Sequence, residues 1–227
     1  MSCSATTGDA AAAGLSRVVS IVARLCVTAL VLLSACADER RYSALGPGAV
    51  VLAFGDSVTH GTGAGRGEDY PSRLALSTGW RVINAGIPGD TAGQARERIE
   101  PLLAEHSPSL VIVALGGNDF LRQRSPAAVK EDLRAIVHSV RGAGALPVLV
   151  AVPRLSLLRA TVGALEDSPI YAELADEEGV LLVEDLFSAV LSDEALRADP
   201  IHPNAAGYRA FAAGLSGAFR EAGLAGD

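Results

Sequence analysis

The chain has 227 residues, of which 49% are hydrophobic and 20% charged, and its formal net charge is −7. This length suits one domain with a substantial core, and this composition excludes a disordered protein and a membrane protein with several spans. The sequence has no block of Lys or Arg, so we expect no nucleic acid partner, because phosphate neutralisation needs clustered basic groups.

Residues 1–35 are predicted to be an export signal. Arg17 and Arg24 precede the uncharged segment LCVTALVLLSA, residues 25–35, which is long enough for a signal peptide and too short to span a bilayer. It ends in Leu-Ser-Ala-Cys, which resembles the bacterial lipobox, and Cys36 is then the residue that receives lipid. The alternative, a buried core helix, lacks the amphipathic or capped surroundings that such a helix needs.

Residues 36–48 are expected to form a lipidated N-terminus and a short tether, followed by a folded domain over 49–227. All three cysteines lie at or before Cys36, so the domain is predicted to have no disulfide, thiol nucleophile or cysteine-bound zinc. Ala37 is not the aspartate that tends to retain lipoproteins at the inner membrane of enteric-type bacteria. We therefore expect an anchor in the outer membrane if the host has two membranes.

From Ala49 onward, short β-branched runs alternate with stretches of helical spacing. The runs predict strands over 50–54, 81–85, 110–115, 146–152 and 180–184. The helical stretches are 70–77, 91–105, 126–142, 169–178 and 204–222. This alternation predicts right-handed βαβ units, and the continuous apolar runs favour strands covered on both faces. The expected fold is a three-layer α/β/α sandwich around a parallel five-stranded sheet.

Polar and glycine-rich segments follow the strands, where ligands bind in open α/β sheets. They are Gly55-Asp56-Ser57 after the first strand, GIPGDT (86–91) after the second, GGND (116–119) after the third, and DPIHPN (199–204) before the last helix. Taken singly, each has an ordinary explanation, since Ser57 could cap a helix and Gly89 or Asn118 could form a turn.

Together these segments supply what acyl transfer requires. A serine needs a base to remove its proton, and His202 is suitable. A carboxylate must hold the imidazole in the right tautomer, and Asp199 lies three residues away. A glycine N–H and the Asn118 amide can stabilise a developing oxyanion. One mechanism explains all four segments, which no set of separate turns and caps does.

On these segments the chain resembles the SGNH hydrolases, also called GDSL esterases and lipases. Their blocks are matched by FGDSVTHGTG (54–63), NAGIPGDT (84–91), LGGND (115–119) and DPIHPN (199–204). The resemblance implies that Ser57 is the nucleophile and that His202 is the base, oriented by Asp199. It also implies an oxyanion hole made by Ser57, Gly89 and Asn118, with no metal or cofactor. The branch it resembles most contains bacterial exported arylesterases, thioesterases and lysophospholipases, whose substrates are small-molecule or lipid esters.

Other polar residues near these segments are predicted to have structural roles. His60 is expected to pack or face solvent, and His106 and His138 fall in helical stretches without a second metal ligand nearby. The carboxylates of Asp56, Asp90 and Asp119 are expected to cap or brace loops.

Two alternatives to an acyl or aryl esterase remain at this point. One is a carbohydrate O-deacetylase, although the chain has only ten aromatic residues with which to stack sugars. The other is a flavodoxin-like binding module, which leaves Asn118, Asp199 and His202 without a purpose. Segment 153–169 has apolar residues at Leu155, Leu157, Leu158, Val162 and Leu165. It either covers the acyl site or packs on its own domain as an amphipathic lid.

Overall fold

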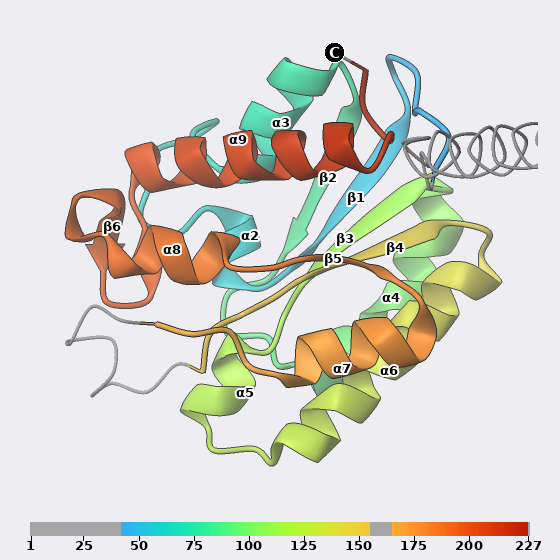
Figure 1. The fold of residues 1–227 in the computed structure, drawn as a ribbon. Helices are drawn as coiled ribbons and strands as arrows, with labels where there is room; N and C mark the ends of the chain where they lie inside the picture. The colour runs from blue at the N-terminus through green and yellow to red at the C-terminus, as the bar shows by residue number, and fades with distance from the viewer. Residues whose placement is uncertain (1–41, 155–164, 227) are drawn as a thin grey trace, which may run out of the picture. The chain divides into compact units, whose positions relative to one another are not determined.

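Five parallel strands form the central sheet, in the order β2-β1-β3-β4-β5 (Figure 1). They are β1 (Val50–Gly55), β2 (Arg81–Gly86), β3 (Leu110–Ala114), β4 (Leu146–Val150) and β5 (Leu181–Val183). This computed structural model describes residues 42–154 and 165–226. The strand predictions are confirmed to within two residues at each end.

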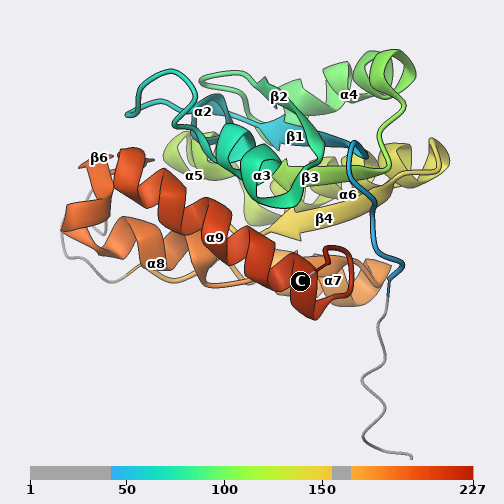
Figure 2. The same cartoon turned by 90° about the horizontal axis from the view of Figure 1, so that it is seen from above.

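Helices cover both faces of the sheet. One layer contains α3 (Tyr70–Thr78), α8 (Leu186–Ser192) and α9 (Ala205–Glu221). The other contains α4 (Ala92–His106), α6 (Pro126–Gly142) and α7 (Ile170–Glu178). Within each layer the helices contact one another, and the two views show the layers on opposite sides of the sheet (Figures 1 and 2). The predicted three-layer sandwich is confirmed.

The apolar pattern of the sequence accounts for these layers. Every residue of β3 is buried, as its continuous apolar run requires of a strand covered on both faces. Helix α6 buries Val129, Leu133, Ile136 and Val140, which recur at helical spacing and form its inner stripe. The edge strand β2 is not buried on both faces as expected. Asn84 is exposed, and the rest of the strand is at most half-buried.

Local signals set the helix ends. Ser125 caps α6 and accepts a hydrogen bond from the Ala128 amide, with Pro126 as the first helical residue. Thr91, rather than Asp90, caps α4, in a capping box with Gln94.

Several short elements were not predicted. They are α2 (Ser57–His60), α5 (Gly117–Leu121), α8, the 3₁₀-helix η2 (Glu194–Leu196), and the two-stranded hairpin of β6 (Arg197–Asp199) and β7 (His202–Pro203). Each spans seven residues or fewer, so a period of 3.6 or 2 residues has no length in which to appear. Most of them carry or border the candidate site.

The chain enters the domain at the end of the sheet opposite that site. The Leu45 amide donates to the carbonyl of Leu224, just beyond α9, and the Gly48 amide donates to that of Gly79, just beyond α3. Among the described residues, no helix is long and apolar enough to cross a membrane. The predicted signal, Cys36 and most of the apolar segment 153–169 lie outside the described residues.

Candidate active site

Ser57 lies where β1 ends, as the first residue of α2. Asp56, not Ser57, caps this helix, because its carboxylate accepts a hydrogen bond from the Val58 amide at 3.0 Å. Helix α2 rests directly on the neighbouring strand end. A Cβ atom on Gly86 would come within 2.2 Å of the His60 backbone nitrogen, so only glycine permits this approach. The Ser57 hydroxyl is therefore not needed as a helix cap and can form a hydrogen bond with another residue.

That partner is His202, on the β6–β7 hairpin. Its Nε2 atom lies 2.9 Å from Ser57 Oγ, and its Nδ1 atom lies 2.8 Å from Asp199 Oδ2. Asp199 and His202 face each other as paired residues of the hairpin. The structure thus brings together three side chains that the sequence separates by up to 145 positions.

The carboxylate of Asp199 fixes the orientation of the imidazole. A carboxylate only accepts hydrogen bonds, so Nδ1 carries the proton and Nε2 presents its lone pair to the Ser57 hydroxyl. The other oxygen of Asp199 accepts from the backbone amides of Ile201 and His202, both at 2.9 Å. Partial burial alone would raise the pKa of Asp199, but the hydrogen bonds from His202 and from these two amides outweigh it and lower that pKa.

Asn118 lies beside Ser57 at the start of α5. Its amide nitrogen donates to Asp56 Oδ2 at 3.1 Å and to the Asp90 carbonyl at 3.0 Å. Burial raises the pKa of Asp56 from 3.8 to about 6, although the Val58 amide, His202 and Asn118 each favour its ionised form. The loops after β1, β2 and β3 therefore meet at the Asn118 amide, which binds the buried carboxylate of Asp56 and the Asp90 carbonyl.

Gly89 lies in the loop between β2 and α4, with a φ of 86°. Its carbonyl accepts a hydrogen bond from Arg122 at 3.0 Å. The next residue, Asp90, is the one whose carbonyl accepts from Asn118, so Gly89 adjoins the site through the backbone. A contribution of its amide to an oxyanion hole remains a prediction.

Arg98, on α4, was not predicted from the sequence, and it ties the ends of β1 and β2 to the loop that follows β2. Its guanidinium donates to Asp90 Oδ2 at 2.7 Å and to the carbonyls of Ala85 and Gly55 at 2.9 Å each. It also stacks 4.4 Å above the ring centroid of Phe54. Only the guanidinium of an arginine can donate to these three acceptors at once. No local sequence pattern predicts contacts between residues so far apart in the chain.

A second brace runs from Asp119, which is fully buried. Its carboxylate accepts from the Ala92 amide at 2.8 Å and from Arg124, which also donates to Asp132 at 2.8 Å. Asp119 thereby holds the start of α4 against α5. The expected structural roles of Asp56, Asp90 and Asp119 agree with these contacts.

Among the described residues, none of the remaining histidines forms a side-chain hydrogen bond with Ser57, Asp199 or His202. His60 is exposed, His106 ends α4 beside Glu105, and His138 contacts Glu178 at 2.9 Å on the outer surface of α6. Within residues 42–154 and 165–226, no group of three or more His, Cys, Asp or Glu side chains is placed to hold a metal ion.

A small pocket opens beside Ser57. Asp56, Asn118 and His202 supply its polar side, and Val58, Leu121, Phe187 and Ile201 supply its apolar side. The apolar residues come from α2, α5, α8 and the hairpin, so several separate elements converge there. A pocket with a nucleophile, polar groups and an apolar wall suits a substrate with both a reacting polar bond and an apolar part.

Comparison with known proteins identifies the family of this chain. The GDSL-like lipase/acylhydrolase family matches residues 53–210. The chain belongs to this family. The match begins in β1 and ends in α9, so it includes all four predicted blocks. Membership makes this GDSL hydrolase an enzyme that cleaves ester bonds, and the predicted resemblance is confirmed.

Named relatives of this GDSL hydrolase are bacterial. It is 35% identical over 162 residues to Thioesterase 1/protease 1/lysophospholipase L1 of Escherichia coli K12, covering 68% of this chain and 75% of that protein. It is 31% identical over 166 residues to Esterase TesA of Pseudomonas aeruginosa, covering 67% and 79%. A crystal structure of TesA superposes with a TM-score of 0.66 at 28% identity, covering 76% of this chain and 99% of that one.

Proposed function

We propose that this GDSL hydrolase is a serine esterase that cleaves carboxylic esters and thioesters through an acyl-enzyme on Ser57. The observation that carries the proposal is the chain of two short contacts, 2.9 Å from Ser57 Oγ to His202 Nε2 and 2.8 Å from His202 Nδ1 to Asp199 Oδ2. This is the arrangement by which a base activates a hydroxyl nucleophile. The names of the E. coli and P. aeruginosa relatives support it.

In the acylation step, Ser57 Oγ attacks the carbonyl carbon of the ester as its proton passes to His202 Nε2. The carbonyl π bond opens and a tetrahedral oxyanion forms. His202 then gives that proton to the leaving alcohol, aryl alcohol or thiol, and the carbonyl re-forms as the bond to the leaving group breaks. Asp199 stabilises the imidazolium through Nδ1 during the step and itself stays ionised.

Deacylation repeats these steps with water. His202 takes a proton from the water as its oxygen attacks the acyl carbon of the Ser57 ester. When the second tetrahedral intermediate collapses, Ser57 leaves as an alkoxide and recovers its proton from His202. The carboxylic acid is released and the enzyme returns to its starting state.

The oxyanion is assigned to three donors. The Ser57 amide is in the first turn of α2, where backbone N–H groups have no partner within the helix, and the Gly89 amide lies in the adjoining loop. The third is the Asn118 amide, which Asp56 and the Asp90 carbonyl hold in place. When the oxyanion forms, the Asn118 amide gives up one of these two hydrogen bonds and donates to the oxyanion instead. The exchange requires little reorganisation because Asn118 stays in position.

The apolar wall of the pocket favours an apolar acyl or aryl group. Leu121, Phe187 and Ile201 surround the space next to Ser57, and none of them offers a hydrogen bond to a sugar hydroxyl. The decisive assay compares p-nitrophenyl acetate, butyrate and octanoate with an acetylated saccharide, using wild type and Ser57→Ala. Turnover of p-nitrophenyl esters that disappears in Ser57→Ala is expected. Turnover of the acetylated saccharide alone would instead favour the carbohydrate O-deacetylase.

We further propose that Cys36 carries a lipid anchor after removal of residues 1–35, and that the enzyme works at the cell envelope, in the outer membrane where two membranes exist. The support is the sequence Leu-Ser-Ala-Cys at the end of an uncharged segment, followed by a short tether. Cells fed a radiolabelled fatty acid should yield labelled wild-type protein and unlabelled Cys36→Ala. An unlabelled wild type would mean ordinary secretion.

A further inference from the structure

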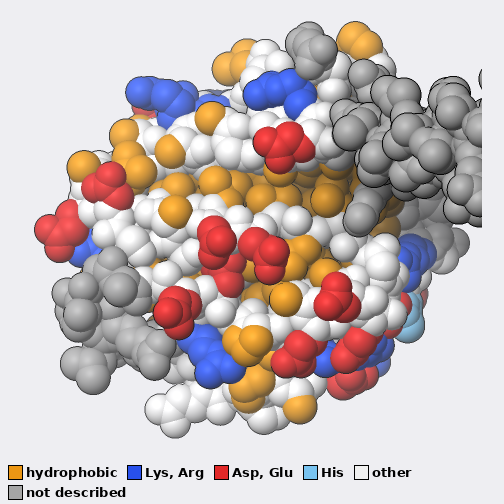
Figure 3. Space-filling view, viewed as in Figure 1, with side chains coloured by type: hydrophobic (Ala, Val, Ile, Leu, Met, Phe, Trp, Pro, Cys, Tyr) orange, Lys and Arg blue, Asp and Glu red, His pale blue; other side chains and the backbone are white. Residues whose placement is uncertain are grey.

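A groove between α3 and α9 lies outside the catalytic machinery. Its lining comes from one stripe on each helix, and the residues are Arg73, Leu76, Ser77, Arg209, Ala212, Ala213, Ser216 and Arg220. None of these eight described residues is acidic, although the chain as a whole has a net charge of −7. Basic side chains also stand out along the edge of the molecule formed by α3 and α9 (Figure 3).

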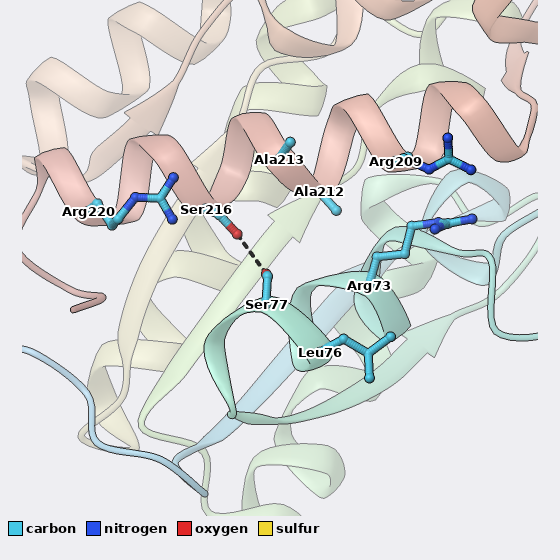
Figure 4. A pocket seen from close by; sticks show the side chains of 8 residues that line it. All are labelled: Arg73, Leu76, Ser77, Arg209, Ala212, Ala213, Ser216 and Arg220. Carbon is cyan, nitrogen blue, oxygen red and sulfur yellow. Dashed lines mark hydrogen bonds between the residues drawn. The ribbon is translucent and has the colours of Figure 1, made fainter. Parts of the chain in front are cut away.

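The arginines of the groove are less fully paired with carboxylates than Arg98, Arg124 and Arg134, which each form an ion pair of 2.8 Å or less. Arg209 and Arg220 make no ion pair within residues 42–154 and 165–226, and both are exposed. Arg73 donates to the Glu68 carbonyl and lies 3.8 Å from that carboxylate, so its charge is partly offset. Figure 4 shows Arg73 and Arg209 side by side at one end of the groove and Arg220 at the other. Neighbouring positive charges of this kind favour an anionic occupant.

The groove combines an exposed leucine with a polar contact across its floor. Leu76 is 85% exposed, one of the largest exposures of any large hydrophobic residue described. Ser77 and Ser216 join across the floor by a hydrogen bond of 2.9 Å, which holds the two helices together (Figure 4). An exposed leucine flanked by arginines presents the two groups that an anionic membrane surface attracts, an apolar side chain for the interface and cations for the headgroups.

The position of the tether points to the same occupant. The described chain begins at Tyr42, and the Leu45 amide is bound to Leu224, four residues beyond Arg220. Tyr42 is only six positions from Cys36, a reach of about 20 Å when fully extended. If Cys36 carries lipid, as proposed above, the Arg220 end of the groove is kept close to the bilayer. The positive charge of the groove favours an anionic surface with or without that anchor.

We propose that the α3–α9 groove docks on the membrane surface by binding the phosphate headgroups of anionic phospholipids. A lipid anchor holds one point of the chain at the bilayer, whereas the groove sets one face of the domain against it. The groove runs from the tether end of the domain toward the end that carries Ser57. Docking therefore places the catalytic end beside the lipid surface, at the height where membrane-bound esters are presented.

The test uses residues 42–227, which form a compact unit with a continuous core of their own, as an independently folding domain does. Its partition is measured by co-sedimentation with vesicles of phosphatidylcholine alone and of phosphatidylcholine mixed with phosphatidylglycerol. Wild type should bind the anionic vesicles and be released by salt. The double variant Arg209→Gln/Arg220→Gln should bind them on the order of thirtyfold more weakly, since each basic residue near such a surface contributes about fivefold.

A matched double variant controls for net charge. Arg96→Gln/Arg141→Gln removes the same two charges from α4 and α6, on the opposite layer, and should bind the anionic vesicles as wild type does. Hydrolysis of a soluble p-nitrophenyl ester should be unchanged in both double variants, which shows that both fold. If wild type binds vesicles but hydrolyses no ester, the proposed function fails while the docking surface stands.

Three results would overturn the docking surface. One is equal binding of wild type to neutral and anionic vesicles, or no binding to either. Another is an equal loss of binding in the two double variants. The third is a wild-type dimer in sedimentation velocity that becomes a monomer in Arg209→Gln/Arg220→Gln, since the groove would then be an interface between two copies of this chain.

Discussion

The two walls of the active site are built in opposite ways. The hairpin wall, which is β6–β7, carries Asp199 and His202, and the Asp199 side chain is 46% exposed. The strand-end wall, which comprises the loops after β1, β2 and β3, carries Ser57 and Asn118 around the buried carboxylate of Asp56. Hydrogen bonds lower the pKa of Asp199, whereas burial raises that of Asp56 to about 6. The ionised form of an aspartate is thus stabilised on the hairpin wall, at Asp199, and destabilised on the strand-end wall, at Asp56.

The two walls also differ in the range of the contacts that hold them, and this difference determines whether a substitution affects turnover or folding. The hairpin wall is local, because Asp199 contacts residues two and three positions away. The strand-end wall is held by contacts across long stretches of chain, such as the 62 positions between Asp56 and Asn118. We therefore expect substitutions in the hairpin wall to affect turnover alone, and those in the strand-end wall to affect both turnover and folding.

The largest expected effect is on the hairpin wall. Asp199→Asn keeps the shape but lets the amide donate to Nδ1, so the imidazole adopts the wrong tautomer and kcat should fall by about 10⁴-fold. The free energy of unfolding at neutral pH should change by less than about 1 kcal/mol, because the side chain is largely solvated. Steady-state kinetics and urea unfolding measure the two quantities. Wild-type turnover in Asp199→Asn would show that Asp199 does not orient His202 for catalysis.

Next is the brace of the strand-end wall. Arg98→Met leaves the carboxylate of Asp90 and two carbonyls without their donor, and should lower the free energy of unfolding by about 3–4 kcal/mol. Turnover should fall as well, because the loop that carries Gly89 loses its support. The matched control is Arg96→Met on the same helix, whose side chain is 57% exposed and should cost less than about 1 kcal/mol. Equal losses in the two variants would contradict the bracing role.

A smaller loss is expected for the third oxyanion donor. Asn118→Ala should lower kcat by about 10²–10³-fold, which is the usual cost of removing one such donor. We expect the loss in kcat and not in KM, since the donor acts on charge that develops only in the transition state. An increase in KM with kcat unchanged would make Asn118 a substrate-binding residue.

The pH dependence of stability distinguishes the two walls most finely. Because the folded-state pKa of Asp56 is raised to about 6, its stabilising contribution is complete below about pH 4 and is lost as the pH rises through 6. The loss is on the order of 3 kcal/mol, since one pKa unit corresponds to about 1.4 kcal/mol. Asp56→Asn should remove this slope in urea unfolding between pH 4 and 7.

Asp199 should behave with the opposite sign. Its pKa is lowered in the folded state, so its contribution is present above pH 4 and is lost as the pH falls further. Asp199→Asn should therefore leave the slope between pH 4 and 7 intact. A slope that disappears in Asp199→Asn and persists in Asp56→Asn would contradict the assignment of the two pKa shifts.

The same contrast explains what the sequence predicts well. The strands and long helices were predicted because their apolar residues recur over many positions, as in α6, which spans Pro126–Gly142 as expected. The pairing of Asp199 with His202 is also local, so a spacing of three residues was enough to suggest it. The contacts of Arg98, Asp119 and Arg124 depend on how distant strand ends meet, and no local pattern contains that information. Helices α2 and α5 carry Ser57 and Asn118 but are too short to have a period.

Covalent labelling of the protein tests directly whether Ser57 forms the acyl-enzyme. Residues 42–227 are treated with a fluorophosphonate, and intact-mass measurement followed by peptide mapping locates the adduct. We expect one adduct per chain, on Ser57, with no label and almost no ester turnover in Ser57→Ala. A fully labelled Ser57→Ala, or an adduct mapped to another residue in wild type, would show that Ser57 is not the nucleophile.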